Sequence, residues 1–463
     1  MLSEIGLIGL GVMGKNIGLN IAEKGTSVKA FNNSYKKLEA VQKEFDRNFS
    51  GYTTLEELVE NMDRPRNLIL MIPSGEPTSN LINQLSNLLD ENDVVIDGGN
   101  SFYQDSVRHG ENLSKKNIKF IGMGVSGGEE GARHGPAIMV GSNNNLDEDL
   151  IELLSSISAK APHDCVGFYE GFGSGHFVKM VHNGIEYAEM QLIAESYHLL
   201  KGAGHSNLEI ADFFDSLKNI NQTSYLIEIT SEILRKKNGE EFTIDLIKPL
   251  ANNKGTGRLT IETSFELGVS APSIYAAYDA RVQSNADDFW KTKSRKRIED
   301  NKDIFDHSEK ISLQTSLAKS LYFGRVAAMI QGLTIIEKYN EINNFSYNFG
   351  DIFKNWSGGC IIRSEMLYEF MEINNVSDNL LHSIQLHDLL KKNLNNIKEI
   401  VSSSMLKNIS LPVFSSSLSW YLNLSAEDNP SNLIQAQRDF FGSHTVQLVN
   451  SDKYIHIDWR EDE

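Results

Sequence analysis

The stretch "GLIGLGVMGKNIGLNIAEKG", Gly6 to Gly25, decides how the first part of this chain folds. Gly9, Gly11 and Gly14 have the G-x-G-x-x-G spacing, directly after a strand-like run and at the start of a helical pattern. These glycines permit a tight turn that brings the backbone close to a pyrophosphate, which the helix N-terminus stabilises. Because a second strand-like run, "SVKAF", ends at the right distance, the stretch predicts a dinucleotide-binding βαβ unit. The alternative is a glycine turn that only packs a helix on a sheet.

Six β-rich runs alternate with helical patterns in this first part, which indicates a mostly parallel sheet. The runs are "EIGLIGL" (4–10), "SVKAFN" (27–32), "NLILMI" (67–72), "DVVIDGG" (93–99), "IKFIGMG" (118–124) and "AIMVG" (137–141). Glycine is concentrated here, and "GFYEGFGSG" (167–175) is predicted to be the joint to the next domain. We therefore expect a Rossmann-like α/β domain at residues 1–176.

The rest of the chain is predicted to be helical, followed by a polar tail. Long stretches with helical spacing, such as "YAEMQLIAESYHLLKGAG" (187–204), are interrupted by only two prolines, Pro249 and Pro272, as far as about Leu411. We expect a large all-α domain at 177–431 for substrate binding and dimerisation. Residues 432–463 are too polar and interrupted for a core element, so we expect a tail that packs on another surface.

Composition narrows the classes of function. The net charge of −18, from 62 acidic and 44 basic residues, argues against nucleic acid or an anionic membrane as a partner. Two cysteines, Cys165 and Cys360, imply no disulfide framework and fit a reducing compartment. No run is long enough to span a membrane, and the N-terminus lacks a basic segment, so a cytoplasmic protein is expected. No cluster has metal-ligand spacing, and no metal site is predicted.

The stretch "KMVHNGIEY" is polar where a helix of a globular protein is normally apolar. On a helix, Lys179, His182, Asn183, Glu186 and Tyr187 fall at i, i+3, i+4, i+7 and i+8, and therefore on one face. Such a stripe usually faces the core. Here the stripe is polar, which raises the question of why one helix would gather these groups on one face, although His182 alone is more often structural than catalytic.

Three segments read together carry a family resemblance: "DGGN" (97–100), "GMGVSGGEEGARHGP" (122–136) and "FVKMVHNGIEY" (177–187). Further matches are "NKGTGR" (253–258), Arg281 in "DAR", "GGCIIRS" (358–364) and "NLIQAQRDFFGSH" (432–444). With these motifs the chain resembles the 6-phosphogluconate dehydrogenases over essentially its whole length. The resemblance implies metal-independent oxidative decarboxylation of 6-phospho-D-gluconate to D-ribulose 5-phosphate and CO2 with reduction of NADP. That reaction belongs to gluconate utilization and the oxidative pentose phosphate pathway.

The resemblance also implies roles for individual residues. Lys179 would be the general base and then the acid, and Glu186 the acid of the last step. Because the ordinary pKa of lysine is about 10.4, Lys179 can act as a base near neutral pH only where desolvation or nearby cations lower it. The implied substrate residues are Asn100, Ser126, Gly127, Gly128, His182 and Asn183 for the carboxylate and hydroxyls, and Tyr187, Lys254, Thr256 and Arg281 for the phosphate. Arg438 and His444, from the tail of a partner subunit, would complete the phosphate site, which implies a homodimer.

The expected cofactor-binding residues are Gly9, Leu10, Gly11, Val12, Met13, Gly14, Asn32, Asn33, Ser34, Lys37 and Asn100. After the second strand, "FNNSYKK" offers amide, hydroxyl and ammonium donors and no carboxylate, which favours NADP. The family commonly has an arginine at Asn33 and a lysine at Pro73, so NAD preference stays open. The hypothesis is that Ser34 and Lys36 or Lys37 compensate. Two other departures are Gly11, commonly alanine, and Ser357, usually arginine.

Two other classes of protein remain as alternatives. A non-decarboxylating β-hydroxyacid dehydrogenase shares the glycine loop, an "SGG" turn and a helix with lysine and asparagine. It would not need the proton donor Glu186 or the phosphate set. A non-catalytic, NADP-sensing protein could use the same fold, but it has no need of an ordered base and acid.

Overall fold

The computed structural model describes residues 2–45, 48–252, 255–286, 307–377 and 379–460, with the side chains of 307–311 excepted. The chain divides into two compact units, Met1–Ser417 and Leu418–Glu463. None of the helices in the described ranges combines the length and apolar character needed to cross a bilayer.

The first unit begins with an eight-stranded sheet in the order β3-β2-β1-β4-β5-β6-β7-β8. Its strands are β1 Glu4–Ile8, β2 Ser27–Phe31, β3 Phe49–Tyr52, β4 Asn67–Leu70, β5 Val94–Asp97, β6 Lys119–Ser126, β7 Ala137–Ser142 and β8 Val166–Glu170. All neighbouring strands are parallel except β6 and β7, which are antiparallel. Each of the six predicted β-rich runs coincides with a strand to within two residues at its ends, or contains it, so the Rossmann-like fold class is confirmed.

Seven helices accompany this sheet: α1 Val12–Glu23, α2 Tyr35–Gln42, α3 Leu55–Glu60, α4 Glu76–Leu85, α5 Tyr103–Ser114, α6 Gly128–His134 and α7 Glu148–Ile157. Successive side chains of a strand point to opposite faces, and β1 shows the result. Leu7 packs in one hydrophobic cluster and Ile8 in a second one. Because both faces are covered, central strands such as β5 are buried throughout, and they appear in the sequence as continuous apolar runs.

Two strands of this sheet were not predicted, and one of them changes the expected domain joint. The strand β8 occupies the first half of "GFYEGFGSG" and pairs with β7, and the next helix begins at Ser174. The prediction of a joint over residues 167–175 was therefore wrong in extent, because only residues 171–173 lie between the two elements. The strand β3 is short and contains Gly51, where a Cβ would press on Leu38 of α2.

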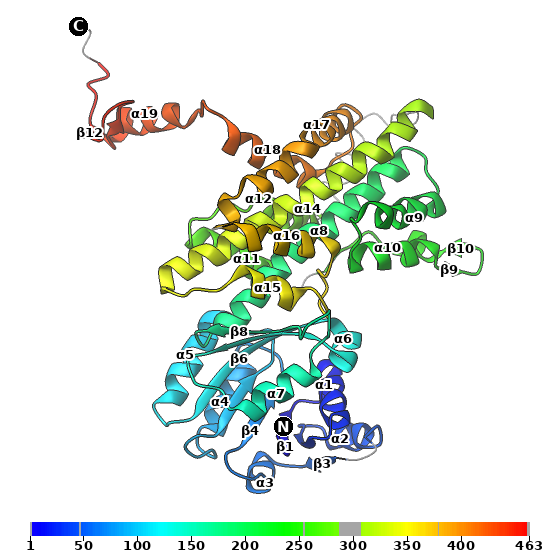
Figure 1. Cartoon of the computed structure of the whole chain (residues 1–463), viewed down its shortest axis with the longest axis vertical. Coiled ribbons are helices and arrows are strands. Elements are labelled where there is room, and N and C mark those ends of the chain that lie inside the picture. The colour runs from blue at the N-terminus through cyan, green and yellow to red at the C-terminus, as the bar shows by residue number, and fades with distance from the viewer. Residues whose placement is uncertain (1, 46–47, 253–254, 287–306, 378, 461–463) are drawn as a thin grey trace. The chain divides into compact units, whose positions relative to one another are not determined.

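After Ser174 the described residues of the first unit are mostly helical, as predicted (Figure 1). Its helices are α8 Ser174–Gly202, α9 Asn207–Ser216, α10 Tyr225–Arg235, α11 Thr256–Glu266, α12 Pro272–Ser284, α14 His307–Asn343, α15 Phe349–Trp356, α16 Glu365–Val376 and α17 Ile384–Leu406. Short 3-10 turns lie at Leu217–Ile220, Thr243–Leu246 and Leu380–His382, and a small hairpin joins β9 Lys237–Asn238 to β10 Glu241–Phe242. The helix α18, Pro412–Ser425, contains the division between the two units.

The helix α8 connects the sheet to the helical part. It packs on β6 and β7 near its start and on α11, α12 and α14 further along (Figure 1). Glycines make the first contact possible: a Cβ on Gly124 of β6 would overlap Lys179, and a Cβ on Gly175 would overlap the carbonyls of Gly122 and Met139. Backbone contact therefore determines where Lys179 lies relative to the sheet.

The second unit contains α19, Ser431–Gly442, and a hairpin of β11 Val446–Gln447 and β12 Tyr454–Ile455. These elements were not predicted, but most of their side chains are exposed, which fits the expectation that the tail is not part of a core. A buried carboxylate, Asp439, organises this unit through polar contacts, which hydrophobic periodicity does not report.

Candidate active site

The glycine turn after β1 is shaped by close backbone contacts. Gly9 has a φ of +98°, which favours glycine, and its N–H donates to the carbonyl of Phe31 at 3.0 Å. A Cβ on Gly14 would overlap the carbonyl oxygen of Gly9, whereas a Cβ on Gly11 would meet nothing within 4 Å. The N–H of Leu10 donates to Oδ1 of Asn32 at 3.0 Å. Asn32 therefore braces the turn from the end of β2.

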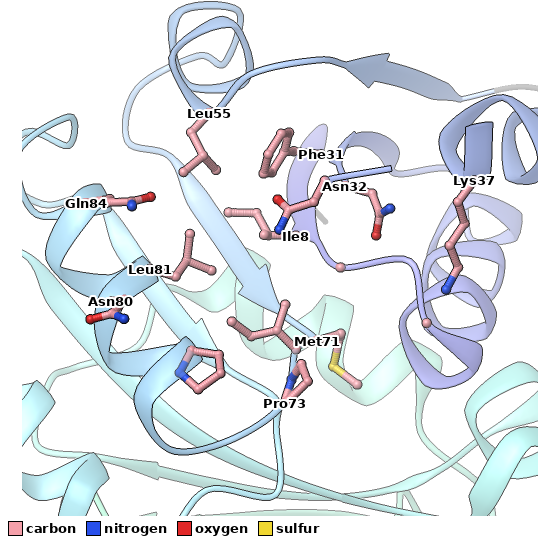
Figure 2. Close-up of a pocket in the computed structure, with 15 residues that line it drawn as sticks. Ile8, Phe31, Asn32, Lys37, Leu55, Met71, Pro73, Asn80, Leu81 and Gln84 are labelled. Carbon is pink, nitrogen blue, oxygen red and sulfur yellow. The ribbon is translucent and has the colours of Figure 1, made fainter. Parts of the chain in front are cut away.

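A pocket of about 580 Å³ lies beside this turn (Figure 2). Figure 2 shows Lys37 on α2 at one side and Asn80, Leu81 and Gln84 on α4 at the other. Among the described residues that line the pocket, Lys37 supplies the ammonium group, and no carboxylate is present. Asn33 and Pro73 also line it, whereas Ser34 and Lys36 do not. The described residues of the wall therefore offer one cation and several amides, and no carboxylate.

Two further pockets continue from the first one. A pocket of about 250 Å³ shares Gly11, Met71, Ile72 and Pro73 with it. The next pocket, of about 480 Å³, shares Met13, Asn100 and Val125 with the second. The three pockets thus share walls in sequence, from the glycine turn to α8. Asn100, predicted to contact both cofactor and substrate, lines the last two.

The polar stripe of α8 lies at the inner end of this track. Lys179, Asn183, Glu186 and Tyr187 all line the third pocket. The Nζ of Lys179 donates to Oδ1 of Asn183 at 2.8 Å and lies 3.2 Å from Nδ1 of His182. Glu186 Oε2 lies 3.7 Å from the same Nδ1. The predicted base and acid therefore face one cavity through a shared polar network.

Burial shifts the pKa values of Lys179 and Glu186 in the directions that acid–base catalysis requires. Desolvation lowers the pKa of Lys179, although the Glu186 charge opposes the shift. Desolvation raises the pKa of Glu186 against the effects of Lys179 and Arg281. A lysine that loses its proton more easily and a carboxyl that keeps it longer suit a general base and a general acid.

His182 is buried completely and does not line the third pocket. Its Nε2 lies 3.2 Å from Oγ of Ser126, and its ring packs edge-on against Trp356. Desolvation and the Lys179 charge hold the pKa of His182 well below its usual range. The neutral imidazole therefore links Ser126, which lines the pocket, to Lys179, and it holds the amine in place.

The other end of the third pocket is suited to an anion. The guanidinium of Arg281 lies 3.5 Å from the centroid of the Tyr187 ring, and Thr256 at the start of α11 also lines the pocket. Gly257 allows this packing, because a Cβ there would overlap the Tyr187 ring. Lys254, the remaining predicted phosphate residue of this part, lies outside the described residues.

The backbone turn predicted to hold a carboxylate is present at the same cavity. Gly127 and Gly128 both have positive φ values, 135° and 62°, and both line the third pocket after Ser126. The sequence did not indicate four other lining residues: Val125, Met190, Asn252 and Ile361. Ile361 lies within the motif 358–364 and Asn252 directly precedes the motif 253–258, but neither residue type by itself indicates a functional site.

The predicted tail residues lie in the second unit. Arg438 is on α19 and His444 is two residues beyond its end, and both are exposed. Within the described ranges, no three or more His, Cys, Asp or Glu side chains gather in a way that could hold a metal ion.

Comparisons with known proteins agree on one family. A model of the NAD binding domain of 6-phosphogluconate dehydrogenase matches residues 4–169, and one of its C-terminal domain matches residues 175–459. The decarboxylating 6-phosphogluconate dehydrogenase of Lactococcus lactis subsp. lactis is 39% identical, over 99% of this chain and 98% of the relative. That of Staphylococcus epidermidis is 38% identical, over 100% of both chains.

A solved structure extends the agreement to three dimensions. Plasmodium falciparum 6-phosphogluconate dehydrogenase, described in its apo form and in complexes with its cofactor NADP+ and its substrate 6-phosphogluconate, matches with a TM-score of 0.93. It is 34% identical and covers 98% of this chain and 100% of its own. Fold, pockets and comparisons together define a dinucleotide-dependent oxidoreductase. The chain belongs to the family of decarboxylating 6-phosphogluconate dehydrogenases, which confirms the resemblance found in the motifs.

Proposed function

We propose that this enzyme oxidises and decarboxylates 6-phospho-D-gluconate to D-ribulose 5-phosphate and CO2, with Lys179 as base and Glu186 as acid. One observation carries these roles: both side chains face a single pocket at the end of the dinucleotide track. Asn100, Ser126, Gly127, Gly128 and Asn183 surround the same cavity and would hold the sugar acid's carboxylate and hydroxyls. The nicotinamide, when bound, supplies the hydride acceptor.

The first step needs a neutral amine near the C3 hydroxyl of the substrate. Desolvation favours that form of Lys179, and Asn183 and His182 aim its Nζ. Lys179 takes the hydroxyl proton as hydride leaves C3. The general-base contribution of such a group is about 10²–10⁴-fold in rate.

The second and third steps use the protons that the network now holds. The carbonyl at C3 is β to the carboxylate, so it accepts the electrons released with CO2. The ammonium of Lys179 donates a hydrogen bond to the developing oxyanion. Glu186, two helical turns along α8, then delivers a proton to C1 of the enediol, which a raised pKa allows.

NADP is the cofactor in this proposal, and it is preferred over NAD. Lys37 lines the pocket and would face a 2′-phosphate, and no carboxylate among the described residues lines the pocket to hold a free 2′-hydroxyl. Asn33 and Pro73 provide no charge, so the preference rests on a point-charge ammonium rather than a planar guanidinium. We expect a looser preference than an arginine would give.

The substrate phosphate would be held by Tyr187, Thr256 and Arg281, joined by Lys254. Arg438 and His444 would come from the tail of a second copy, so the working enzyme is a homodimer. The domains are 1–176 for the dinucleotide, 177–431 for substrate and dimerisation, and 432–463 for the exchanged tail. We expect the enzyme to act in the cytoplasm, without a nucleic acid or a membrane as a partner.

An absorbance assay at the reduced-nicotinamide band tests this function directly. Purified enzyme is given 6-phosphogluconate with NADP or with NAD, and released CO2 is trapped in parallel. We expect equal amounts of reduced cofactor and CO2, and a higher kcat/KM with NADP. Reduction without CO2 would show a non-decarboxylating dehydrogenase, and a higher kcat/KM with NAD would refute the cofactor preference.

A further inference from the structure

The second unit is organised around one carboxylate that no part of the proposed mechanism uses. Asp439 follows Arg438 on α19 and is completely buried. Its Oδ1 accepts hydrogen bonds from the Thr445 N–H at 2.7 Å and faces the His456 ring nitrogen at 2.9 Å. Its Oδ2 accepts from the Ile457 N–H at 3.0 Å and the Trp459 indole N–H at 2.9 Å. The carboxylate thus joins three separate segments of the tail.

We propose that Asp439 is a positioning residue for recognition of the substrate phosphate, because it holds the turn that presents His444 beside Arg438. This inference rests on the proposed role of the tail in completing the phosphate site. In this proposal Asp439 does not touch the substrate. It acts through the side chains of Arg438 and His444.

The turn that carries His444 is unusual and needs such a support. The residues on either side of His444, Ser443 and Thr445, have φ values of +50° and +60°. Positive φ is disfavoured for residues other than glycine, and especially for a β-branched residue such as Thr445. Conformations of this kind persist only where surrounding contacts enforce them, and they gather at functional sites. Here the Asp439–Thr445 hydrogen bond enforces the conformation.

A second side chain of α19 supports the same turn. Nε2 of Gln435 donates to the carbonyl oxygen of Thr445 at 2.7 Å, and its Oε1 accepts from Nη1 of Arg438 at 3.0 Å. One residue therefore orients Arg438 and fixes the turn beyond it. In addition, a Cβ on Gly442 would come within 2.9 Å of the His444 ring, so the imidazole packs directly against that glycine. The orientations of Arg438 and His444 are thus set together inside the tail.

An asparagine at 439 would keep the shape of the side chain but break half of this arrangement. Each carboxylate oxygen faces two partners, and an amide replaces one oxygen with an NH2 donor. At least one buried N–H would then face another donor, which is costly. The charge removed is matched by Asp452→Asn, because Asp452 is exposed in the same unit.

The test compares full-length Asp439→Asn, Asp452→Asn and Gly442→Ala with the unsubstituted enzyme. We expect Asp439→Asn and Gly442→Ala to raise KM for 6-phosphogluconate about ten-fold or more, with a smaller change in kcat. The Kd of NADP and the oligomeric state measured by light scattering should stay unchanged, as should all properties of Asp452→Asn. An unchanged KM in Asp439→Asn, or loss of the oligomer at assay concentration, would overturn the inference.

A double-mutant cycle separates positioning from general support of the tail. If Asp439 acts through its neighbours, adding Asp439→Asn to Arg438→Ala/His444→Ala should raise KM by less than two-fold further. A full additional ten-fold increase would overturn the inference. The Arg438→Ala/His444→Ala variant also tests the proposed function separately: if its KM is unchanged, the tail has no part in phosphate binding. If its KM rises while that of Asp439→Asn does not, only the positioning role fails.

Discussion

The Nζ of Lys179 lies 2.8 Å from Oδ1 of Asn183, one turn further along the same buried helix. This contact fixes an amine that burial has made easier to deprotonate, and that amine lines the third pocket. We predict that Lys179→Met abolishes oxidation of 6-phosphogluconate, with kcat reduced by at least about 10³-fold. Binding of NADP, measured by fluorescence titration, should be retained. Lys201→Met on the same helix is the control, and a similar loss there would contradict a specific role.

Glu186→Gln should change the shape of the pH profile as well as the rate. The pair Lys179 and Glu186 is active when it holds one proton, with the amine neutral and the carboxyl protonated. Activity of the unsubstituted enzyme therefore falls at low pH, when both are protonated, and at high pH, when both have lost the proton. In Glu186→Gln only the amine titrates, so kcat/KM should rise to a plateau without the alkaline fall. If the pH profile of Glu186→Gln stays bell-shaped, a group other than Glu186 causes the fall in activity at high pH.

Substitution by alanine should have a large effect at one glycine of the dinucleotide turn and a small effect at another. A Cβ on Gly14 would overlap the carbonyl of Gly9, whereas one on Gly11 meets open space. We expect Gly14→Ala to weaken NADP binding by about ten-fold or more, and Gly11→Ala to change stability by less than about 0.5 kcal/mol. Calorimetric titration with NADP and thermal melts check both. Equal effects of the two substitutions would show that turn geometry does not control binding.

Asn33→Arg should sharpen the choice between the two nicotinamide cofactors. Asn33 lines the pocket with Lys37, and a guanidinium there would add bidentate hydrogen bonds to a phosphate. We expect the ratio of kcat/KM for NADP over NAD to rise about ten-fold in Asn33→Arg and to fall in Lys37→Ala. The matched control is Lys36→Ala, because Lys36 does not line the pocket. A ratio that is insensitive to Lys37 would place the 2′-phosphate elsewhere.

Glu195 should make stability depend on pH. This residue of α8 is buried, and it accepts the N–H groups of Val413 and Phe414 at the start of α18. Burial raises its pKa to about 7, above the unfolded value of about 4.3. The folded state then binds the extra proton, so stability is lost as pH rises from about 4.5 to about 7. The stability lost over this pH range is on the order of 3–4 kcal/mol.

Glu195→Gln should remove this dependence. Urea unfolding at pH 5 and pH 8 would show a smaller difference between the two conditions in the variant than in the unsubstituted enzyme. Glu228→Gln, at an exposed position of α10, serves as the control and should leave the difference unchanged. If both variants behave like the parent, Glu195 does not titrate in the folded protein.

Much of the fold could be predicted from the sequence because its signals are local. The strand β5 is a continuous apolar run, and the glycine turn has a fixed spacing. The strand β8 was missed because the glycines of 167–175 favoured a joint, whereas pairing with β7 makes residues 166–170 a strand. The tail helix was missed because polar contacts with residues further along the chain hold it, whereas the small hairpin, also missed, pairs residues only three to five positions apart.

The motifs named many of the residues that line the third pocket, but they did not indicate how those residues contact one another. The sequence placed His182 with the substrate contacts, whereas the folded chain buries it between Ser126 and Lys179. Periodicity identifies a shared helical face, and it does not report which member of that face reaches solvent. Met190 and Ile361 line the same cavity without any chemical signature, because only the packing of α8 against later segments brings them there.

The continuity of α8 limits how this enzyme could be taken apart. The helix lies against glycines of β6 and β7 at one end and among α11, α12 and α14 at the other. If the chain were cut or truncated between residues 170 and 174, the sheet would lose the helix that packs closely on β6 and β7. The helical part would keep α8, but the first turns of this helix would be exposed. Neither fragment would have a complete hydrophobic core. The sheet part and the helical part of the first unit should therefore unfold together in one cooperative transition.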